Sequence, residues 1–152
     1  MPIQFLTGDI FYTGAQTIAN GCNCRGRMGA GIARDIKKRL PAMYKSLCHQ
    51  NLIVPGGYYL YRESEPWILN LATQDKLGGA RIEYVEECLE NFTGYYEEEG
   101  TISLAIPRIA AGLGGLQWED IKELLIEILE PLPIPIYVYE HYEKFTKGNE
   151  II

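Results

Sequence analysis

The feature that most constrains this chain is a glycine-rich segment, Pro107–Trp118, that lies between an apolar run and a helical pattern. The run 102–106 has the length and composition of a buried strand. The stretch 119–129, with Trp118 before it, places apolar residues at helical spacing. The segment therefore predicts a strand, a glycine loop and a helix in succession.

The backbone of this loop is suited to holding an anion. Gly112, Gly114 and Gly115 allow backbone angles that are closed to other residues, and they let a ligand lie against the main chain. Inward-facing N–H groups can form an anion nest, and the N-terminus of the following helix adds a favourable dipole. The alternative is that these glycines only form tight turns.

A second glycine-rich segment, Asn20–Gly31, follows a candidate strand over 17–20 and leads into a helical stripe over 28–40. It matches neither the P-loop motif nor the dinucleotide-binding motif. The amides of Asn20 and Asn23 can both donate and accept hydrogen bonds, which suits ribose hydroxyls. Alternatively, both residues serve as turn formers in left-handed conformations.

The remaining segments alternate between strand and helix. Asp9, in a turn after a first strand over 3–6, caps a helix or accepts from a ligand amine, and the cap is favoured. Pro41 divides the next helix. A hairpin over 58–61 and 67–71, a polar loop over 72–79, a helix over 81–98 stopped by Gly100 and a last strand over 136–139 follow. The polar tail 140–152 is expected to be frayed or weakly helical.

This alternation, with one hairpin in the middle, predicts a single domain over residues 1–152 with three α/β/α layers and a mixed central sheet. Ligands of such folds bind at the carboxyl ends of the strands. Both glycine loops, the Asp9 turn and Thr73 come at such ends. We therefore expect all four to converge on one cleft.

Charge and cysteine content narrow the possible partners. The net charge of −6 argues against a broad basic face for nucleic acid, but it leaves a small anionic ligand open. Cys22 and Cys24 form a C-x-C pair with no second pair behind it, so we expect buried thiols and no metal. No apolar run is long enough to cross a membrane, and the start does not resemble a signal peptide, which favours the cytoplasm and no membrane partner.

Taken in order, five motifs resemble those of a macrodomain, specifically the branch of terminal and DNA ADP-ribose glycohydrolases. The resemblance covers nearly the whole chain. It rests on Gly8–Ile10, Asn20–Ala33, Trp67–Thr73, Ile106–Trp118 and Val138–Tyr139.

The resemblance implies that the cleft binds ADP-ribose and needs no cofactor. It implies that Asp9 holds the adenine amine with help from the backbone of Ile10, and that Tyr139 lies beside the adenine. Asn20 and Asn23 are expected near the distal ribose, with Thr73 at the same edge. The phosphate-side positions are Met28, Gly29, Ala30, Gly31 and Ile32 in the first loop, and Pro107, Ala111, Gly112, Leu113, Gly114, Gly115 and Leu116 in the second.

The resemblance also implies hydrolysis of an ADP-ribosyl bond on protein, on DNA or in a small ester. The candidate catalytic groups are Asn23 for positioning, Asp75 as a base and Lys76 as an acid or electrostatic stabiliser, although each could be an ordinary solvated loop residue. The relatives carry a lysine where this chain has Gln74, and one has an acid where this chain has Gly114. Glutamine is neither a nucleophile nor a charged acid, so a non-catalytic ADP-ribose reader and a binder of another nucleotide remain open.

Overall fold

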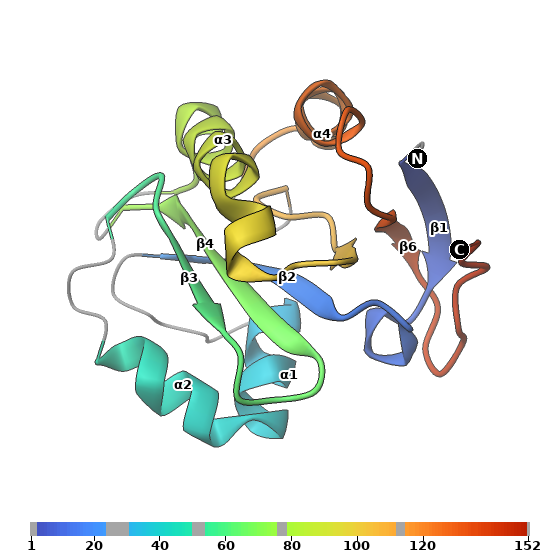
Figure 1. Cartoon of the computed structure of the whole chain (residues 1–152), viewed down its shortest axis with the longest axis horizontal. Helices are drawn as coiled ribbons and strands as arrows, with labels where there is room; N and C mark the ends of the chain where they lie inside the picture. The colour runs from blue at the N-terminus through green and yellow to red at the C-terminus, as the bar shows by residue number, and fades with distance from the viewer. Residues whose placement is uncertain (1–2, 24–30, 50–53, 76–78, 112–114, 152) are drawn as a thin grey trace.

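The computed structural model of the chain describes residues 3–23, 31–49, 54–75, 79–111 and 115–151 (Figure 1). The strands are β1 (Gln4–Gly8), β2 (Thr17–Asn23), β3 (Tyr58–Tyr61), β4 (Trp67–Gln74), β5 (Leu104–Ile106) and β6 (Ile136–Tyr142). The helices are α1 (Gly31–Arg39), α2 (Pro41–Cys48), α3 (Ile82–Glu99) and α4 (Trp118–Leu129), with a short 3-10 helix, η1 (Ile10–Tyr12), after β1.

The described strands form one six-stranded sheet in the order β1-β6-β5-β2-β4-β3. Neighbouring strands pair in parallel throughout, except that β3 pairs with β4 in an antiparallel hairpin. The sheet is therefore mixed, as the sequence predicts. The parallel pairing brings the carboxyl ends of β1, β6, β5, β2 and β4 to one edge, where this class of fold binds its ligands.

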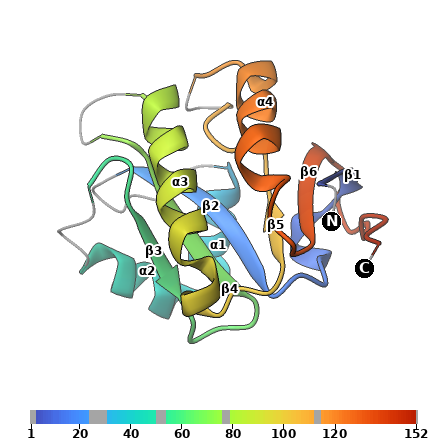
Figure 2. The same ribbon diagram turned by 45° about the horizontal axis from the view of Figure 1, so that its top comes forward.

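The two faces of the sheet are buried by different helices. Successive side chains on a strand point to opposite faces, so Ile18 and Ala19 of β2 enter separate apolar clusters. Ile68 and Leu69 of β4 divide in the same way. Figures 1 and 2 show α3 and α4 over one face and α1 and α2 over the other. This arrangement confirms the three-layer α/β/α fold.

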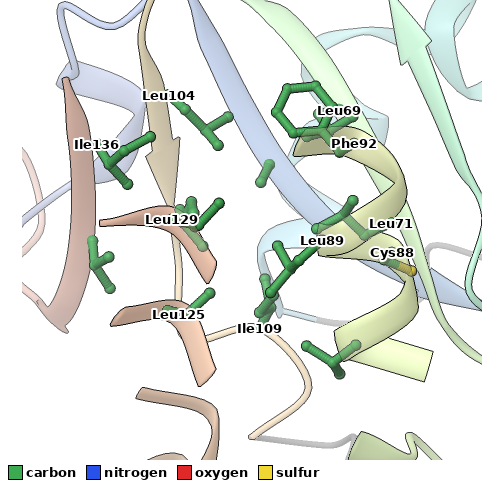
Figure 3. Packing of buried hydrophobic residues seen from close by; sticks show 14 of the residues in the cluster. Leu69, Leu71, Cys88, Leu89, Phe92, Leu104, Ile109, Leu125, Leu129 and Ile136 are labelled. Atoms are coloured by element: carbon green, nitrogen blue, oxygen red, sulfur yellow. The ribbon is translucent and has the colours of Figure 1, made fainter. Parts of the chain in front are cut away.

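The core under α3 and α4 fixes the helix that follows the second glycine loop. Figure 3 shows Leu125 and Leu129 of α4 close to Leu104 and Ile136 of the sheet. Leu125 and Leu129 are fully buried, and burying such side chains contributes about 1.5–3 kcal/mol each. With α4 held in this way, the end of the loop that precedes it is held as well.

The tail differs from the expected frayed end. Strand β6 continues to Tyr142, and the residues after it return along β1 (Figure 1). The side chain of Gln4 accepts a hydrogen bond from Ile151 N at 3.0 Å, and its Nε2 donates to Ile151 O at 2.7 Å. The tail is therefore bound to the first strand of the sheet.

Candidate functional site

Three strand ends meet around Gly21 of β2. A β-carbon at this position would lie 3.4 Å from the Oγ1 of Thr73, 3.8 Å from the Cβ of Ile109 and 3.9 Å from the backbone nitrogen of Ala110. Thr73 lies near the end of β4, while Ile109 and Ala110 lie just beyond β5. Thr73 and the start of the second glycine loop therefore lie on either side of the same residue, Gly21. These are ordinary van der Waals distances, so residue 21 lies in contact range of both segments.

The second glycine loop is anchored in the core at its start. Ile109 is buried, and Figure 3 shows its side chain in the cluster under α3 and α4. Pro107 and Ala111, on either side of it, are half-buried. The backbone nitrogen of Leu116 donates to the carbonyl of Ala110 at 3.1 Å, which closes the loop.

Backbone geometry in this loop is restricted at two described positions. Ala110 has φ 61° and Gly115 has φ 85°, both in the left-handed region. Among the described residues, a β-carbon built on Gly115 would meet nothing within 4 Å. Gly115 is therefore favoured by its backbone angle, and no described residue crowds the position of its missing side chain. Gly112, Leu113 and Gly114 lie outside the described residues.

The candidate catalytic residues come from two paired strand ends. In the parallel ladder of β2 and β4, Asn23 is the register partner of Gln74. The half-buried Asp75 follows directly. Thr73 is buried, and its carbonyl accepts a hydrogen bond from Arg81 N at 3.2 Å. The side chain of Asn23 and the whole of Lys76 lie outside the described residues, so the catalytic assignment stays a prediction.

Asn20 lies inside the sheet. Its side chain is fully buried, and its Nδ2 donates to the Oδ1 of Asn70 at 3.1 Å. Asn70 in turn donates to the carbonyl of Tyr59 at 3.3 Å. The Oδ1 of Asn20 has no hydrogen-bond partner among the described residues. A buried acceptor without a partner lowers the stability of the fold. This oxygen could accept a hydrogen bond from a ligand, and the expected contact of Asn20 with a ribose stays a prediction.

The residues expected at the adenine lie where β1 and β6 end side by side. Leu6 pairs with Tyr139, and Asp9 follows β1 directly. Asp9 is buried and is the N-cap of η1, since its Oδ1 accepts from Phe11 N at 3.1 Å. Its Oδ2 accepts from Phe145 N at 3.1 Å. The cap role is therefore present, and it does not use all of the acceptor capacity of a carboxylate.

The tail covers this end of the site. The backbone nitrogen of Asp9 donates to Thr146 O at 2.6 Å. The buried hydroxyl of Tyr139 hydrogen-bonds the carboxylate of Glu150. Glu150 also accepts from the hydroxyl of Thr13 and, at 2.9 Å, from Gly14 N. Burial, with the neighbouring Glu150, raises the pKa of Tyr139 far above its ordinary value, so the hydroxyl stays protonated as a donor.

The first glycine loop is described only at its end. Met28, Gly29 and Ala30 lie outside the described residues. Gly31 opens α1, and the half-buried Ile32 packs on the cluster under α1 and α2. The placement of this loop against a ligand stays a prediction.

Two broader features bear on chemistry. No group of three or more His, Cys, Asp or Glu side chains suited to a metal ion occurs among the described residues. In the same part of the chain, no helix combines the length and apolar character needed to span a membrane.

Some structural residues at the site were not expected from the sequence. Asn70 accepts a hydrogen bond from Asn20. The one clue to it in the sequence is that it is the single polar residue of the apolar run 67–71. Gly21 lies beside Thr73, but nothing in the sequence distinguishes it from the other glycines of the segment 20–31. Glu150 lies 137 residues from Thr13 in sequence, and no local pattern predicts their contact.

Comparisons with known proteins agree with this architecture. A family model described as Macro domain matches residues 19–125. The chain is 30% identical over 159 residues to a DNA ADP-ribosyl glycohydrolase of Thermus aquaticus, an alignment that takes in 99% of this chain and 44% of the relative. It is 29% identical over 143 residues to the human ADP-ribose glycohydrolase OARD1, with 90% of each chain covered. The chain spans less than half the length of the Thermus relative.

Solved structures match over nearly all of the chain. The macrodomain of Thermus aquaticus DarG is similar with a TM-score of 0.83 and 29% identity, over 91% of this chain and 97% of that one. Thermosipho africanus DarTG, solved in complex with ADP-ribose, is similar with a TM-score of 0.85 and 29% identity, over 94% of this chain and 42% of that one.

Proposed function

The chain belongs to the Macro domain family, and from that premise we propose that it binds ADP-ribose at the carboxyl edge of its sheet and hydrolyses an ADP-ribosyl linkage there. The observation that carries this proposal is the meeting of Thr73 and Ala110 around Gly21. The end of β4 and the start of the second glycine loop thus both lie beside the same residue of β2, which supports a single cleft at this edge. We treat residues 1–152 as one macrodomain.

In this proposal, backbone N–H groups bind the phosphates, and side chains bind the adenine and the distal ribose at the two ends of the ligand. The second glycine loop, Pro107–Leu116, would hold the diphosphate through its N–H groups, which explains anion binding by an acidic protein. Asp9 would accept from the adenine amine beside Tyr139. Asn20 and Asn23 would serve the distal ribose.

Catalysis is assigned to the paired ends of β2 and β4. A water oxygen bonds to the anomeric carbon of the distal ribose while the bond from that carbon to the acceptor breaks. Asp75 takes a proton from the water and Lys76 gives one to the departing acceptor atom. The products are ADP-ribose and the unmodified acceptor. The pairing of Asn23 with Gln74 supports grouping these residues.

We propose that the substrate is ADP-ribosylated DNA, so that the acceptor released is DNA. The relative from Thermus aquaticus, which aligns with 99% of this chain, is named for that activity. An ADP-ribosylated protein or a small ADP-ribose ester is the other possible substrate. A cytoplasmic location is part of this proposal, since it supposes an intracellular substrate.

Turnover tests the proposal. The protein is incubated with an ADP-ribosylated DNA oligonucleotide, and released ADP-ribose is measured by chromatography. We expect release, and we expect Asp75→Asn to slow it by about a hundredfold, the usual size of a general-base contribution. Glu63→Ala is the matched control, because Glu63 lies in the exposed turn between β3 and β4.

A reader that binds without turnover is the second candidate. Gln74, in place of the lysine of the related enzymes, is the observation that favours it. If no ADP-ribose is released from modified DNA, modified protein or an ADP-ribose ester while ADP-ribose itself binds, the protein is a reader.

A further inference from the structure

The C-terminal tail, residues 143–151, lies across the residues expected at the adenine. Figure 1 shows it returning beside β1. The nitrogen of Asp9 donates to the carbonyl of Thr146 at 2.6 Å. The nitrogen of Phe145 donates to the Oδ2 of Asp9 at 3.1 Å. The tail therefore contacts both the backbone and the carboxylate of Asp9.

The bond to the carboxylate comes from a residue with a strained backbone. Phe145 has φ 61°, in the left-handed region that a residue with a β-carbon rarely adopts. Its side chain is 65% exposed, so burial of the ring does not account for this angle. Strained residues persist where the contacts around them hold them in place. The bond from Phe145 to the buried Asp9 is one such contact.

Glu150 anchors the far end of the tail. Its carboxylate accepts hydrogen bonds from the hydroxyls of Thr13 and Tyr139, and from the nitrogen of Gly14 at 2.9 Å. These donors come from two separate segments, the loop after η1 and strand β6. Hydrogen bonds to an ionised carboxylate are stronger than those between neutral groups. One side chain thus fastens the tail to the body of the domain.

Between this anchor and Asp9 the tail packs without free space. A β-carbon on Gly148 would lie 2.9 Å from the Cε2 of Tyr139, which is closer than real contacts allow. A β-carbon on Gly8, the residue before Asp9, would lie 2.8 Å from the nitrogen of Gly148. The tail therefore rests directly on the end of β1 and on the ring expected beside the adenine.

Selectivity for an amino group on a base requires an acceptor with a fixed position. The Oδ1 of Asp9 accepts from Phe11 N, and its Oδ2 accepts from Phe145 N. The terminal torsion of an aspartate is otherwise broad, so loss of the bond from the tail would let the carboxylate turn. A base with an oxo group in place of the amine would bring an acceptor against this carboxylate, and a fixed acceptor rejects it most strongly.

We propose that the tail is a positioning element of the cleft. Through its anchor, Glu150, it sets how strongly the cleft prefers a purine with an amino group over one with an oxo group. Glu150 is a positioning residue, because it acts through Asp9 and contacts no part of the ligand. This inference rests on the proposed function, since it supposes that Asp9 accepts from the adenine amine.

Calorimetry with two ligands tests this role. The ligands are ADP-ribose and its inosine analogue, in which an oxo group replaces the adenine amine. We expect the unaltered protein to bind ADP-ribose more tightly by at least about tenfold, because the analogue would leave a buried acceptor unsatisfied. Glu150→Ala is expected to lower this ratio by about fivefold or more, mainly through weaker binding of ADP-ribose. Thr13→Val, which removes one donor to Glu150, is expected to lower the ratio less.

Arg62→Ala is the matched control for a loss of stability alone. Arg62 joins the turn after β3 to the end of α3 through hydrogen bonds to Glu99 at 2.8 and 3.2 Å. This contact lies at the edge of the sheet opposite the carboxyl ends of the parallel strands. The variant is expected to lower the unfolding free energy in urea and to leave the ratio of affinities unchanged. A role of Glu150 in stability alone would make the two variants alike.

The outcomes separate this inference from the proposed function. Absence of ADP-ribose binding in the unaltered protein refutes the proposed function, and this inference with it. The inference alone is overturned if the unaltered protein binds both ligands equally, or if Glu150→Ala keeps the original ratio or binds ADP-ribose more tightly. It is also overturned if Arg62→Ala lowers the ratio as much. If Glu150→Ala does not fold, Thr13→Val decides by the same criteria.

Discussion

The two ends of the candidate cleft are built in different ways. At the adenine end, Asp9 and Tyr139 are buried, and each is hydrogen-bonded to the returning tail. At the distal-ribose end, the candidate groups come from the loops that begin where Asn23 and Gln74 pair. One end is thus fixed by backbone bonds between distant segments, and the other depends on a few side chains after two strands.

This difference implies that the proposed binding and the proposed catalysis can be tested separately. Recognition of the nucleotide follows from the folded backbone, so it should persist through changes at the distal end. In the proposed mechanism, turnover depends on individual groups near Gln74. Each of the following changes acts on one end or on the loop that joins them.

The largest effect is expected from Gly115→Asn, in the loop between the two ends. Asparagine tolerates the left-handed backbone that this position requires, and its side chain would extend from a position that no described residue crowds, where we propose that the phosphates lie. We expect ADP-ribose affinity to fall by at least about a thousandfold, or about 4 kcal/mol. Calorimetry measures the loss, and urea unfolding checks that the fold is retained.

Gly100→Asn is the matched control for this change. Gly100 has φ 90° at the end of α3 and precedes β5, away from the carboxyl edge of the sheet. It should lose a similar amount of stability and bind ADP-ribose normally. If Gly115→Asn also binds normally, the loop does not cradle the phosphates and its glycines are turn formers.

At the distal end, Gln74→Lys is expected to raise turnover. A lysine there supplies the charge that the macrodomain resemblance implies at this position, and a well-placed acid contributes about a hundredfold or more to rate. Release of ADP-ribose from modified DNA measures the change, with ADP-ribose affinity unaltered. Gln74→Met, of similar length and without charge, is the control. Equal rates for the lysine and methionine variants would exclude this position from the chemistry.

At the adenine end, Asp9→Asn is expected to weaken ADP-ribose binding by about 1–3 kcal/mol through loss of a charge-assisted acceptor. Because Asp9 also accepts from Phe11 N and Phe145 N, the unfolding free energy should fall as well. Asp35→Asn, on α1, is the control. A variant that loses stability but binds ADP-ribose normally would limit Asp9 to its capping role.

The smallest effect is expected from Tyr139→Phe, which removes the hydroxyl bonded to Glu150 at a cost of about 1 kcal/mol. Since the folded pKa of Tyr139 is raised, its contribution to stability is present below about pH 10 and is lost as the pH rises further. The variant should therefore lose less stability than the unaltered protein between pH 9 and 11 on urea unfolding. Tyr95→Phe, on the exposed side of α3, is expected to behave like the unaltered protein.

Local patterns predicted the elements that carry the site. The apolar run 102–106 predicted β5, and the helical spacing of apolar residues from Trp118 onward predicted α4. Both predictions were possible because the burial pattern of each element lies within one short segment. Gly100 ended α3 as expected, since only a left-handed residue closes the helix there. The parallel pairing of the strands then brought Thr73 to the second loop.

Features that depend on distant contacts were not predictable in this way. The tail looked polar and without period, yet Glu150 bonds three groups from distant segments of the chain. The hydrogen bond from Asn20 to Asn70 of the neighbouring strand was not expected either, and the contact of Asn20 with a ribose stays a prediction. In both cases the deciding interaction joins residues far apart in sequence, and no short window contains both partners.

Calorimetric titration of the unaltered protein with ADP-ribose tests the central claim most directly. The proposal predicts saturable heat with a dissociation constant in the low-micromolar range or tighter, about −8 kcal/mol, and weaker binding of AMP, which lacks the second phosphate and the distal ribose. No heat and no thermal shift at millimolar ADP-ribose would contradict the claim that this cleft recognises ADP-ribose.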